Sequence, residues 1–239
     1  MKPFLVVCVL VLLYVSADAQ QIVFMPSWTA QSEFAGYYVA DSLGYYREEG
    51  LDVRVRHPTV SETSFSFLER GEVQIIVSNL SNALTMVNAG RRIVNVMQTS
   101  QTNGLMLVSR FPLPDIASLN HQKIAVWNRL PLDLLERITR VSGLDVEWIR
   151  FNGGVNIFLS GAADIFITYS FNEYPQLEEY GMRPDSCHVF RLAEYGYNLP
   201  EGGLYVTEEY YNTHEDMIRK FVKASIRGWN WVERNREKA

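Results

Sequence analysis

Short apolar runs alternate with helical repeats along this chain, and that alternation limits its fold more than any other feature of the sequence. In the first half, strands and helices are expected in turn at residues 22–25, 33–47, 51–56, 61–70, 73–77, 80–89 and 93–97. Gly50, Gly71 and Gly90 follow the three helices, where a glycine commonly ends a helix. Repeated strand–helix–strand units predict a mostly parallel sheet with helices on its faces, which is an α/β fold.

The pattern restarts after a proline-containing break at residues 111–114. Strands and helices are then expected at residues 123–127, 131–142, 146–149, 157–159, 164–168, 172–180 and 204–206. A long amphipathic helix should follow, with Thr213 as its N-cap. Its predicted buried side carries Met217, Ile218, Phe221, Val222, Ile226, Trp229 and Val232. Two α/β units of about ninety residues each, joined near residues 108–114, are the simplest organisation.

The first nineteen residues have the pattern of a secretory signal. Lys2 precedes an unbroken apolar run at residues 4–15, and small residues stand at Ala17 and Ala19. The run is shorter than the about 20 residues that span a bilayer. We therefore expect cleavage near Ala19, a mature chain that begins near Gln20, and a periplasmic or secreted location. An uncleaved membrane anchor is the alternative.

Several classes of function are disfavoured by composition and by the absence of motifs. Cleavage would leave Cys187 as the only cysteine, so no internal disulfide is expected. The four histidines have no metal-ligand spacing, and no metal site is predicted. No nucleotide-binding loop or nucleophile elbow is present. With 22 basic and 27 acidic residues and no basic stripe, the chain is a poor candidate for binding nucleic acid.

Two segments, 27–40 and 44–53, carry a resemblance to a known family. The second, GYYREEGLDV, joins a helix end, its glycine and the next strand. Together they resemble the SsuA/Thi5-like (NMT1-type) substrate-binding proteins of ABC importers, and residues 68–73 and 162–165 match further. The resemblance covers residues 21–239. It implies a type II periplasmic binding protein, with two Rossmann-like lobes and a ligand cleft at the hinge.

The resemblance also implies a division of the chain. The expected parts are a signal peptide at 1–19, the first part of lobe 1 at 20–110, lobe 2 at 111–198 and a return to lobe 1 at 199–239. Members of the family usually continue for several tens of residues beyond this end, so the return to lobe 1 is expected to be truncated.

Candidate ligand-binding residues follow from the geometry of open α/β sheets, in which ligands bind outside the carboxyl ends of strands and near helix N-termini. The candidates are Trp28, Gln31, Phe34, Ser78, Asn79, Asn82, Thr99, Trp127, Asn128, Asn152, Gly153, Gly154, Tyr169, Asn172 and Glu173. Aromatic faces stack on flat rings, and amides offer paired donors and acceptors. Only Arg129 adds a basic residue near these strand ends, which disfavours an anionic sulfonate or nitrate.

Glu173 can accept two hydrogen bonds from the edge of an aminopyrimidine. The resemblance implies that an acid occupies a similar place in pyrimidine-binding relatives and that the Trp28 position lies against the ring. Each candidate also has a purely structural interpretation. Trp28 could cover the edge of a lobe, Trp127 could belong to the core, Asn79 could start a helix, and Glu173 could be a solvated acid at a helix start.

Some eukaryotic relatives make the thiamine pyrimidine from their own histidine and bound pyridoxal phosphate. The resemblance implies that they need a lysine and a histidine where this chain has Ser78 and Asn82. It also implies a cysteine-rich segment where residues 194–203 have no cysteine, and a glycine-rich phosphate loop in place of residues 128–131. We therefore expect no catalysis and no cofactor.

The predicted function is that of an extracytoplasmic solute-binding protein. It would capture a small ring ligand, similar to a thiamine pyrimidine precursor, by hinge closure and deliver it to an ABC permease, acting as a monomer. Two alternatives remain open at the level of the sequence. One is the ligand-sensing extracellular domain of a membrane receptor, a kinase or a cyclase; the other is a binder of sulfonates or other small organic ions.

Overall fold

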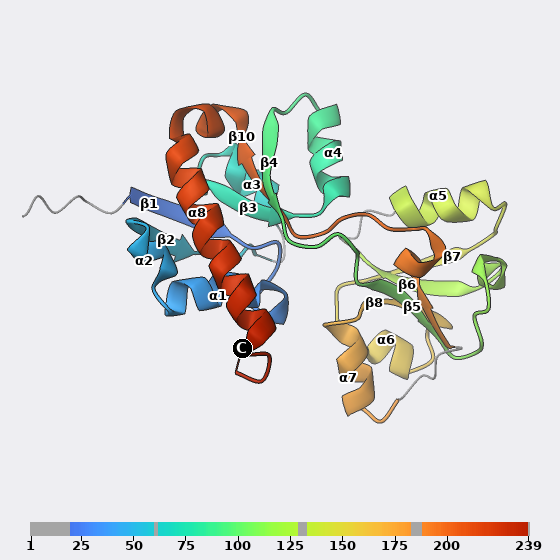
Figure 1. Ribbon diagram of the computed structural model, residues 1–239. Helices are drawn as coiled ribbons and strands as arrows, with labels where there is room; N and C mark the ends of the chain where they lie inside the picture. Colours follow the sequence, from blue (N-terminus) through green and yellow to red (C-terminus); the bar gives the residue numbers. More distant parts are fainter. Residues whose placement is uncertain (1–19, 60–61, 129–132, 183–187, 239) are drawn as a thin grey trace, which may run out of the picture.

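A computed structural model describes residues 20–59, 62–128, 133–182 and 188–238. The expected signal peptide, Cys187 and Arg129 lie outside the described residues. The chain forms two lobes, each built on a five-stranded sheet, and two segments of chain cross between them (Figure 1). None of the helices in the described part combines the length and apolar character that a membrane span requires.

Lobe 1 contains a sheet with the strand order β2-β1-β3-β10-β4. Its strands are β1 (Gln20–Met25), β2 (Leu51–Val55), β3 (Ile75–Ser78), β4 (Ile93–Gln98) and β10 (Gly203–Thr207). β1 pairs in parallel with β2 and β3, whereas β10 runs antiparallel to β3 and β4. The helices of this lobe are η1 (Ser32–Phe34), α1 (Ala35–Ser42), α2 (Tyr45–Glu48), α3 (Ser64–Glu69), α4 (Leu80–Asn88) and α8 (Glu208–Arg234).

Lobe 2 repeats this arrangement with the order β7-β6-β8-β5-β9. Its strands are β5 (Leu105–Ser109), β6 (Lys123–Trp127), β7 (Glu147–Phe151), β8 (Ile165–Tyr169) and β9 (Val189–Arg191). Its helices are η2 (Ile116–Leu119), α5 (Asp133–Val141), α6 (Asn156–Leu159), α7 (Glu173–Glu179) and η4 (Leu192–Tyr195). In each lobe, the strand that arrives from the other lobe, β10 or β5, enters the sheet antiparallel to both neighbours.

Each sheet buries both of its faces, as expected for a largely parallel sheet. In lobe 1 the neighbouring residues Phe24 and Met25 of β1 point to opposite faces and join different clusters. Phe24 packs against Tyr37 of α1 and Phe221 of α8, with ring centroids 4.8 and 5.3 Å apart. The lobes are therefore three-layered, and the periodic apolar runs of the sequence form their cores.

The lobe boundary predicted at residues 110 and 111 is wrong. β5 ends before the proline-containing break and pairs with β8 and β9 of lobe 2, so the first crossing lies at residues 99–104. A short apolar run predicts a buried strand, but it does not indicate which sheet that strand joins. The second crossing, residues 198–202, lies between η4 and β10. Neither β5 nor the three-residue strand β9 was predicted as a strand.

Two helices also differ from the sequence prediction. The helix expected at 33–47 is split into η1, α1 and α2, and the break between α1 and α2 falls at Gly44, which adopts a left-handed conformation with φ of 77°. Helix α8 begins at Glu208, where the Thr207 side chain accepts a hydrogen bond from the Tyr210 backbone, and it is kinked at His214, where φ is −134° and ψ is 30°. The predicted cap Thr213 lies next to this kink, but its hydroxyl donates back to the Glu209 carbonyl and so caps no helix. Ile226, predicted to be buried, is 46% exposed.

Helix α8 lies directly against α1, and two glycines allow this close approach. A Cβ atom on Gly228 would lie 2.0 Å from the Gly36 carbonyl oxygen and 2.9 Å from Ala40 Cβ. A Cβ atom on Gly36 would lie 2.3 Å from the Trp229 ring. The long helix therefore holds its place on lobe 1 through backbone contact that side chains would prevent.

We predict that Gly228→Ala lowers the free energy of unfolding by about 1–3 kcal/mol, the usual cost of overpacking. Alanine otherwise stabilises a helix interior by about 1 kcal/mol relative to glycine, so the sign of the change is informative. Urea denaturation measures it, with Asn230→Ala at an exposed position of the same helix as control. A more stable Gly228→Ala protein would contradict the close helix packing.

Candidate functional site

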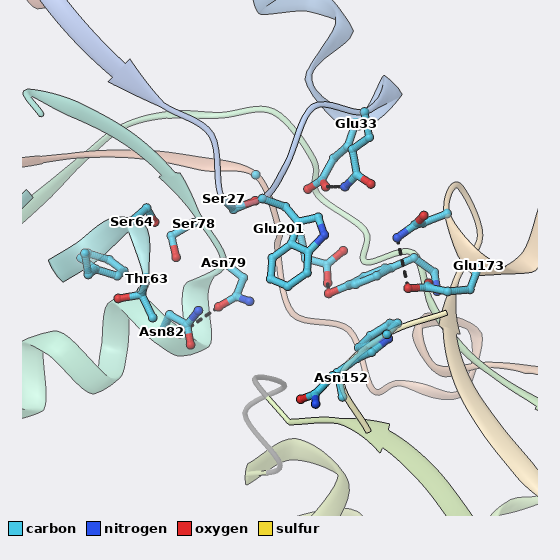
Figure 2. A pocket seen from close by; sticks show the side chains of 18 of the residues that line it. Ser27, Glu33, Thr63, Ser64, Ser78, Asn79, Asn82, Asn152, Glu173 and Glu201 are labelled. Carbon is cyan, nitrogen blue, oxygen red and sulfur yellow. Dashed lines mark hydrogen bonds between the residues drawn. The ribbon is translucent and has the colours of Figure 1, made fainter. Parts of the chain in front are cut away.

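A cavity of about 500 Å³ lies between the two lobes, and we call it the interlobe cavity. Its walls are the segments after β1 and β3, the starts of α3 and α4, the ends of β6, β7 and β8, and the start of α7. Figure 2 shows Asn79 and Asn82 of lobe 1 across the cavity from Glu173 of lobe 2, with Glu201 of the second crossing between them. The volume is in the usual range of small-molecule sites, about 300–1,000 Å³.

Twelve of the fifteen candidate residues line the interlobe cavity. They are Trp28, Gln31, Ser78, Asn79, Asn82, Trp127, Asn152, Gly153, Gly154, Tyr169, Asn172 and Glu173. They come from five separate segments of chain, 28–31, 78–82, 127, 152–154 and 169–173, as expected if a ligand binds at the carboxyl ends of the strands.

The other three candidates lie outside this cavity. Phe34 is 1% exposed and packs in the core of lobe 1. The Thr99 hydroxyl donates a hydrogen bond of 2.6 Å to the Gly202 carbonyl and so joins the two crossing segments. Asn128 is exposed and donates through its side chain to the Asn152 side chain. The strand-end rule predicts where a segment lies but not where each side chain points.

Lobe 2 supplies an aromatic wall. The Trp127 and Tyr169 rings stack with centroids 5.1 Å apart and planes 13° from parallel. Phe171, which does not line the interlobe cavity, also stacks with Tyr169, at 5.0 Å and 18°. From lobe 1 the half-buried Trp28 faces the cavity, and its carbonyl oxygen accepts a 2.7 Å hydrogen bond from His57 Nδ1. Flat rings on both sides suit a flat ligand.

Two acidic residues that the sequence did not single out, Glu33 and Glu201, also line the cavity. Gln31 Nε2 donates to Glu33 Oε2 at 2.7 Å. Glu201 Oε2 accepts from the Gly104 backbone at 3.0 Å, and Glu201 Oε1 accepts from the Tyr169 hydroxyl at 3.0 Å. Glu201 thus links both crossing segments to the aromatic wall. Glu33 lies between the candidates Gln31 and Phe34, so the strand-end rule reached its segment but did not select it. Glu201 precedes a predicted strand, so the rule did not indicate it.

Burial raises the pKa of both groups. The pKa of Glu33 is raised to about 7 by desolvation, with a further contribution from the negative charge of Glu201. The pKa of Glu201 is also raised to about 7 by desolvation, against the opposing effect of its hydrogen bonds. Two carboxyl groups at the hinge therefore change charge near neutral pH.

Glu173 is buried, not solvated: it is 5% exposed. Its Oε2 accepts from the Tyr169 backbone at 3.2 Å and from the Thr168 hydroxyl at 3.4 Å, and its Oε1 accepts from Asn172 Nδ2 at 3.1 Å. Burial raises its pKa, and the hydrogen bond from Tyr169 opposes this shift. Glu173 therefore fixes the end of β8, where the aromatic wall begins.

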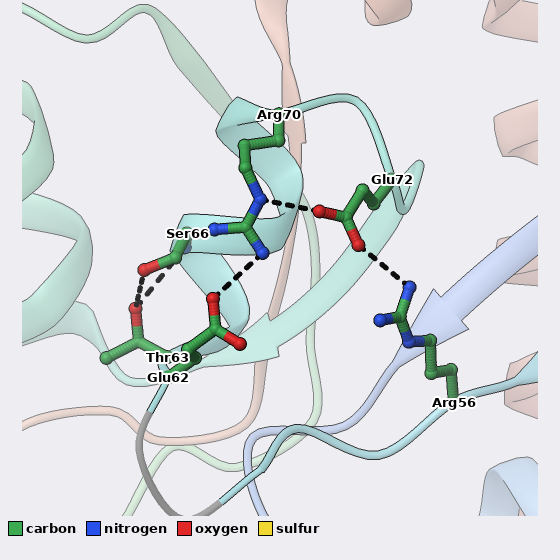
Figure 3. Close-up of polar contacts among 6 residues, drawn as sticks. All are labelled: Arg56, Glu62, Thr63, Ser66, Arg70 and Glu72. Atoms are coloured by element: carbon green, nitrogen blue, oxygen red, sulfur yellow. Dashed lines mark hydrogen bonds and ion pairs between the residues drawn. The ribbon is translucent and has the colours of Figure 1, made fainter.

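The start of α3 contributes Thr63, Ser64 and Phe65, which sequence reasoning missed because the segment after β2 was not considered. Thr63 caps the helix, with its hydroxyl accepting from the Ser66 backbone at 3.3 Å. A chain of exposed ion pairs surrounds this helix: Glu62–Arg70 at 3.0 Å, Arg70–Glu72 at 2.5 Å and Glu72–Arg56 at 3.0 Å (Figure 3). Exposed pairs of this kind add little stability each.

Among the described residues, none that lines the interlobe cavity is lysine, arginine or histidine, while three are glutamates. Within the same described ranges, no group of acidic, histidine or cysteine side chains is arranged to hold a metal ion. The chemistry of the site is thus aromatic stacking, amide hydrogen bonding and carboxylate acceptance, which suits a ligand with N–H donors.

We predict that the ligand-free protein loses stability as the pH rises from about 5 to about 8, because Glu33 and Glu201 bind protons more tightly when folded than when unfolded. Their stabilising contribution is complete below the unfolded pKa of 4.5 and is lost as the pH passes about 7. Melting temperatures at both pH values test this. The double variant Glu33→Gln/Glu201→Gln should show a smaller fall, and parallel curves would contradict the assignment.

Comparison with known proteins agrees with this fold. The family described as NMT1/THI5 like matches residues 31–239. The formylaminopyrimidine-binding protein of Halalkalibacterium halodurans is 25% identical over 228 residues, which cover 90% of this chain and 67% of that protein. The 4-amino-5-hydroxymethyl-2-methylpyrimidine phosphate synthase THI13 of Saccharomyces cerevisiae is 23% identical, with 90% of this chain and 68% of that protein covered. The chain spans about two thirds of the length of the curated relatives it matches.

Among solved structures, the periplasmic aliphatic sulphonate binding protein SsuA from Escherichia coli matches with a TM-score of 0.70. It is 16% identical, and the match covers 92% of this chain and 76% of that one. At this identity the likeness shows the fold alone, and it agrees with the two lobes and the paired crossings. The chain belongs to the NMT1/THI5-like family and has the two-lobed fold of the periplasmic binding proteins.

Proposed function

We propose that this chain is an extracytoplasmic solute-binding protein that captures a small, flat nitrogen heterocycle in the interlobe cavity and delivers it to an ABC permease. One observation carries the proposal: the cavity combines stacked aromatic walls with amide and carboxyl groups, and no basic side chain among the described residues lines it. Such a site favours rings with N–H donors over sulfonates or phosphates.

Hinge closure is the mechanism that the connection between the lobes supports. The crossing segments are joined to each other by hydrogen bonds, from the Thr99 hydroxyl to the Gly202 carbonyl at 2.6 Å and from the Asn103 backbone to Asn198 Oδ1 at 2.8 Å. A joined pair of short segments can bend as one hinge. A ligand that touches both walls then stabilises the closed arrangement by its differential affinity for it.

The pyrimidine class is supported by two independent lines. The relative from Halalkalibacterium halodurans is named as a binding protein for formylaminopyrimidine. In this chain, Trp28 and the Trp127–Tyr169 stack provide flat surfaces, and Asn82, Asn152 and Gln176 provide amides along the same cavity. A pyrimidine with an exocyclic amino group needs both kinds of contact.

The same cavity argues against the synthase activity named for the yeast relatives. The two positions where the resemblance implies a lysine and a histidine hold Ser78 and Asn82, and both line the cavity. Neither a hydroxyl nor a carboxamide replaces an amine that must form a covalent bond or an imidazole that must react. We therefore propose binding without catalysis or cofactor, by a monomer in the periplasm or outside the cell.

A thermal-shift screen of the ligand-free protein tests the ligand class. We predict that aminopyrimidines raise the melting temperature, and that alkanesulfonates such as MOPS do not. A ligand at a hundredfold excess over its Kd adds about 2.7 kcal/mol of stability. Flavins form a third arm, because their fused ring is also flat. A response confined to sulfonates would contradict the proposed ligand class.

We predict that Trp28→Ala abolishes the ligand-induced shift, because the indole provides the lobe 1 surface for stacking. The loss of intrinsic stability should be smaller than the about 3–5 kcal/mol of a fully buried tryptophan, since Trp28 is half-buried. Trp231→Ala, at a half-buried position outside the cavity, is the matched control and should keep the shift. If Trp28→Ala strongly lowers the melting temperature of the ligand-free protein but keeps the ligand-induced shift, the residue only covers the lobe edge.

A further inference from the structure

The carboxyl groups of Glu33, Glu173 and Glu201 differ in how many of their oxygens accept hydrogen bonds from the protein. Both oxygens of Glu173 and both oxygens of Glu201 accept hydrogen bonds from the protein. Glu33 accepts through Oε2 only, from Gln31. Within the described residues, Glu33 Oε1 has no donor, although the group lies on the cavity wall.

The surroundings of Glu33 leave its charge uncompensated. The groups that face it are Glu201 of the second crossing, Tyr37 and Tyr38 of α1, and Tyr169 of β8. All are neutral or acidic, and no described basic residue lines the cavity. A carboxylate held out of water without a positive partner is costly, which agrees with the raised pKa of Glu33. A ligand donor placed at Oε1 would relieve this cost.

We propose that Glu33 is a specificity-determining residue, whose free oxygen accepts a hydrogen bond from the exocyclic amino group or a protonated nitrogen of the bound ring. This inference rests on the proposed function and narrows its substrate class to nitrogen heterocycles that carry an amino donor. Glu173 was the carboxylate expected in this role, but its oxygens already hold the end of β8. Figure 2 shows Glu33 and Glu201 approaching the cavity from neighbouring segments of chain.

The position of Glu33 also places the ligand's donor near the hinge. Glu33 belongs to η1 of lobe 1, whereas the adjacent Glu201 is bonded to the Tyr169 hydroxyl of the lobe 2 wall. A ring stacked on that wall with its amino group toward Glu33 would contact both lobes at once. The same hydrogen bond would therefore both select ligands with an amino donor and stabilise the closed arrangement of the lobes.

The test uses a pair of probes that differ only in the donor, 4-amino-2-methylpyrimidine and 2-methylpyrimidine, titrated by calorimetry near pH 8. For the wild-type protein we expect tighter binding of the amino compound. In Glu33→Gln its affinity should fall about tenfold or more, the range for a charge-assisted hydrogen bond, while 2-methylpyrimidine changes little. Glu178→Gln, which removes one exposed charge on α7, is the matched control and should bind as the wild type does.

The outcomes separate this inference from the proposed function. If the wild-type protein binds neither pyrimidine, the proposed function fails and the inference fails with it. If the wild type binds the amino compound and Glu33→Gln binds it equally well, the inference alone is overturned. An equal loss for both probes in Glu33→Gln would also overturn it. The melting temperature of the ligand-free variant near pH 8 should equal or exceed that of the wild type, which separates lost binding from misfolding.

Discussion

The double crossing of the chain between the lobes is the constraint on which the interlobe cavity depends. Residues 99–104 leave lobe 1, residues 198–202 return to it, and the Thr99 hydroxyl bonds the Gly202 carbonyl where they run together. Each crossing leads into a strand that enters its sheet antiparallel to the neighbours. The parallel strands of both sheets then direct their carboxyl ends toward one shared space.

Strand ends could be predicted from the sequence because buried strands are visible as short apolar runs. β3 is buried at every residue and ends at Ser78, and β8 is buried at every residue before its last, Tyr169. Both strands were therefore predicted, together with the cavity residues that follow them. β5 was not predicted as a strand, and even a recognised apolar run does not show which of the two sheets it joins. The direction in which the Phe34 side chain points could not be predicted either, because packing in the lobe 1 core determines it.

Glu33 and Glu201 show a second limit of the sequence. Both stand in short connecting segments, where an acid is ordinarily solvated. Only the meeting of η1 with the second crossing removes them from water and raises the pKa of each to about 7. At these two residues the local sequence predicts a solvated acid, whereas the tertiary structure buries it. Such disagreement is expected where a structure gives up stability for a binding site.

The two walls of the cavity are organised differently, and this bears on how a ligand is held. On the lobe 2 side, Trp127 and Tyr169 stack along the cavity, and Phe171, outside the cavity, also stacks with Tyr169. Hydrogen bonds to Glu173 and Glu201 hold Tyr169 to the sheet and to the second crossing. Because these side chains are already held in place, stacking a flat ring on them costs the protein little side-chain entropy. On the lobe 1 side, the half-buried Trp28 and the open oxygen of Glu33 remain to be engaged. Because those groups lie on the other lobe, their contacts with a stacked ring would favour a closed form, which is how the proposed function couples ligand binding to hinge closure.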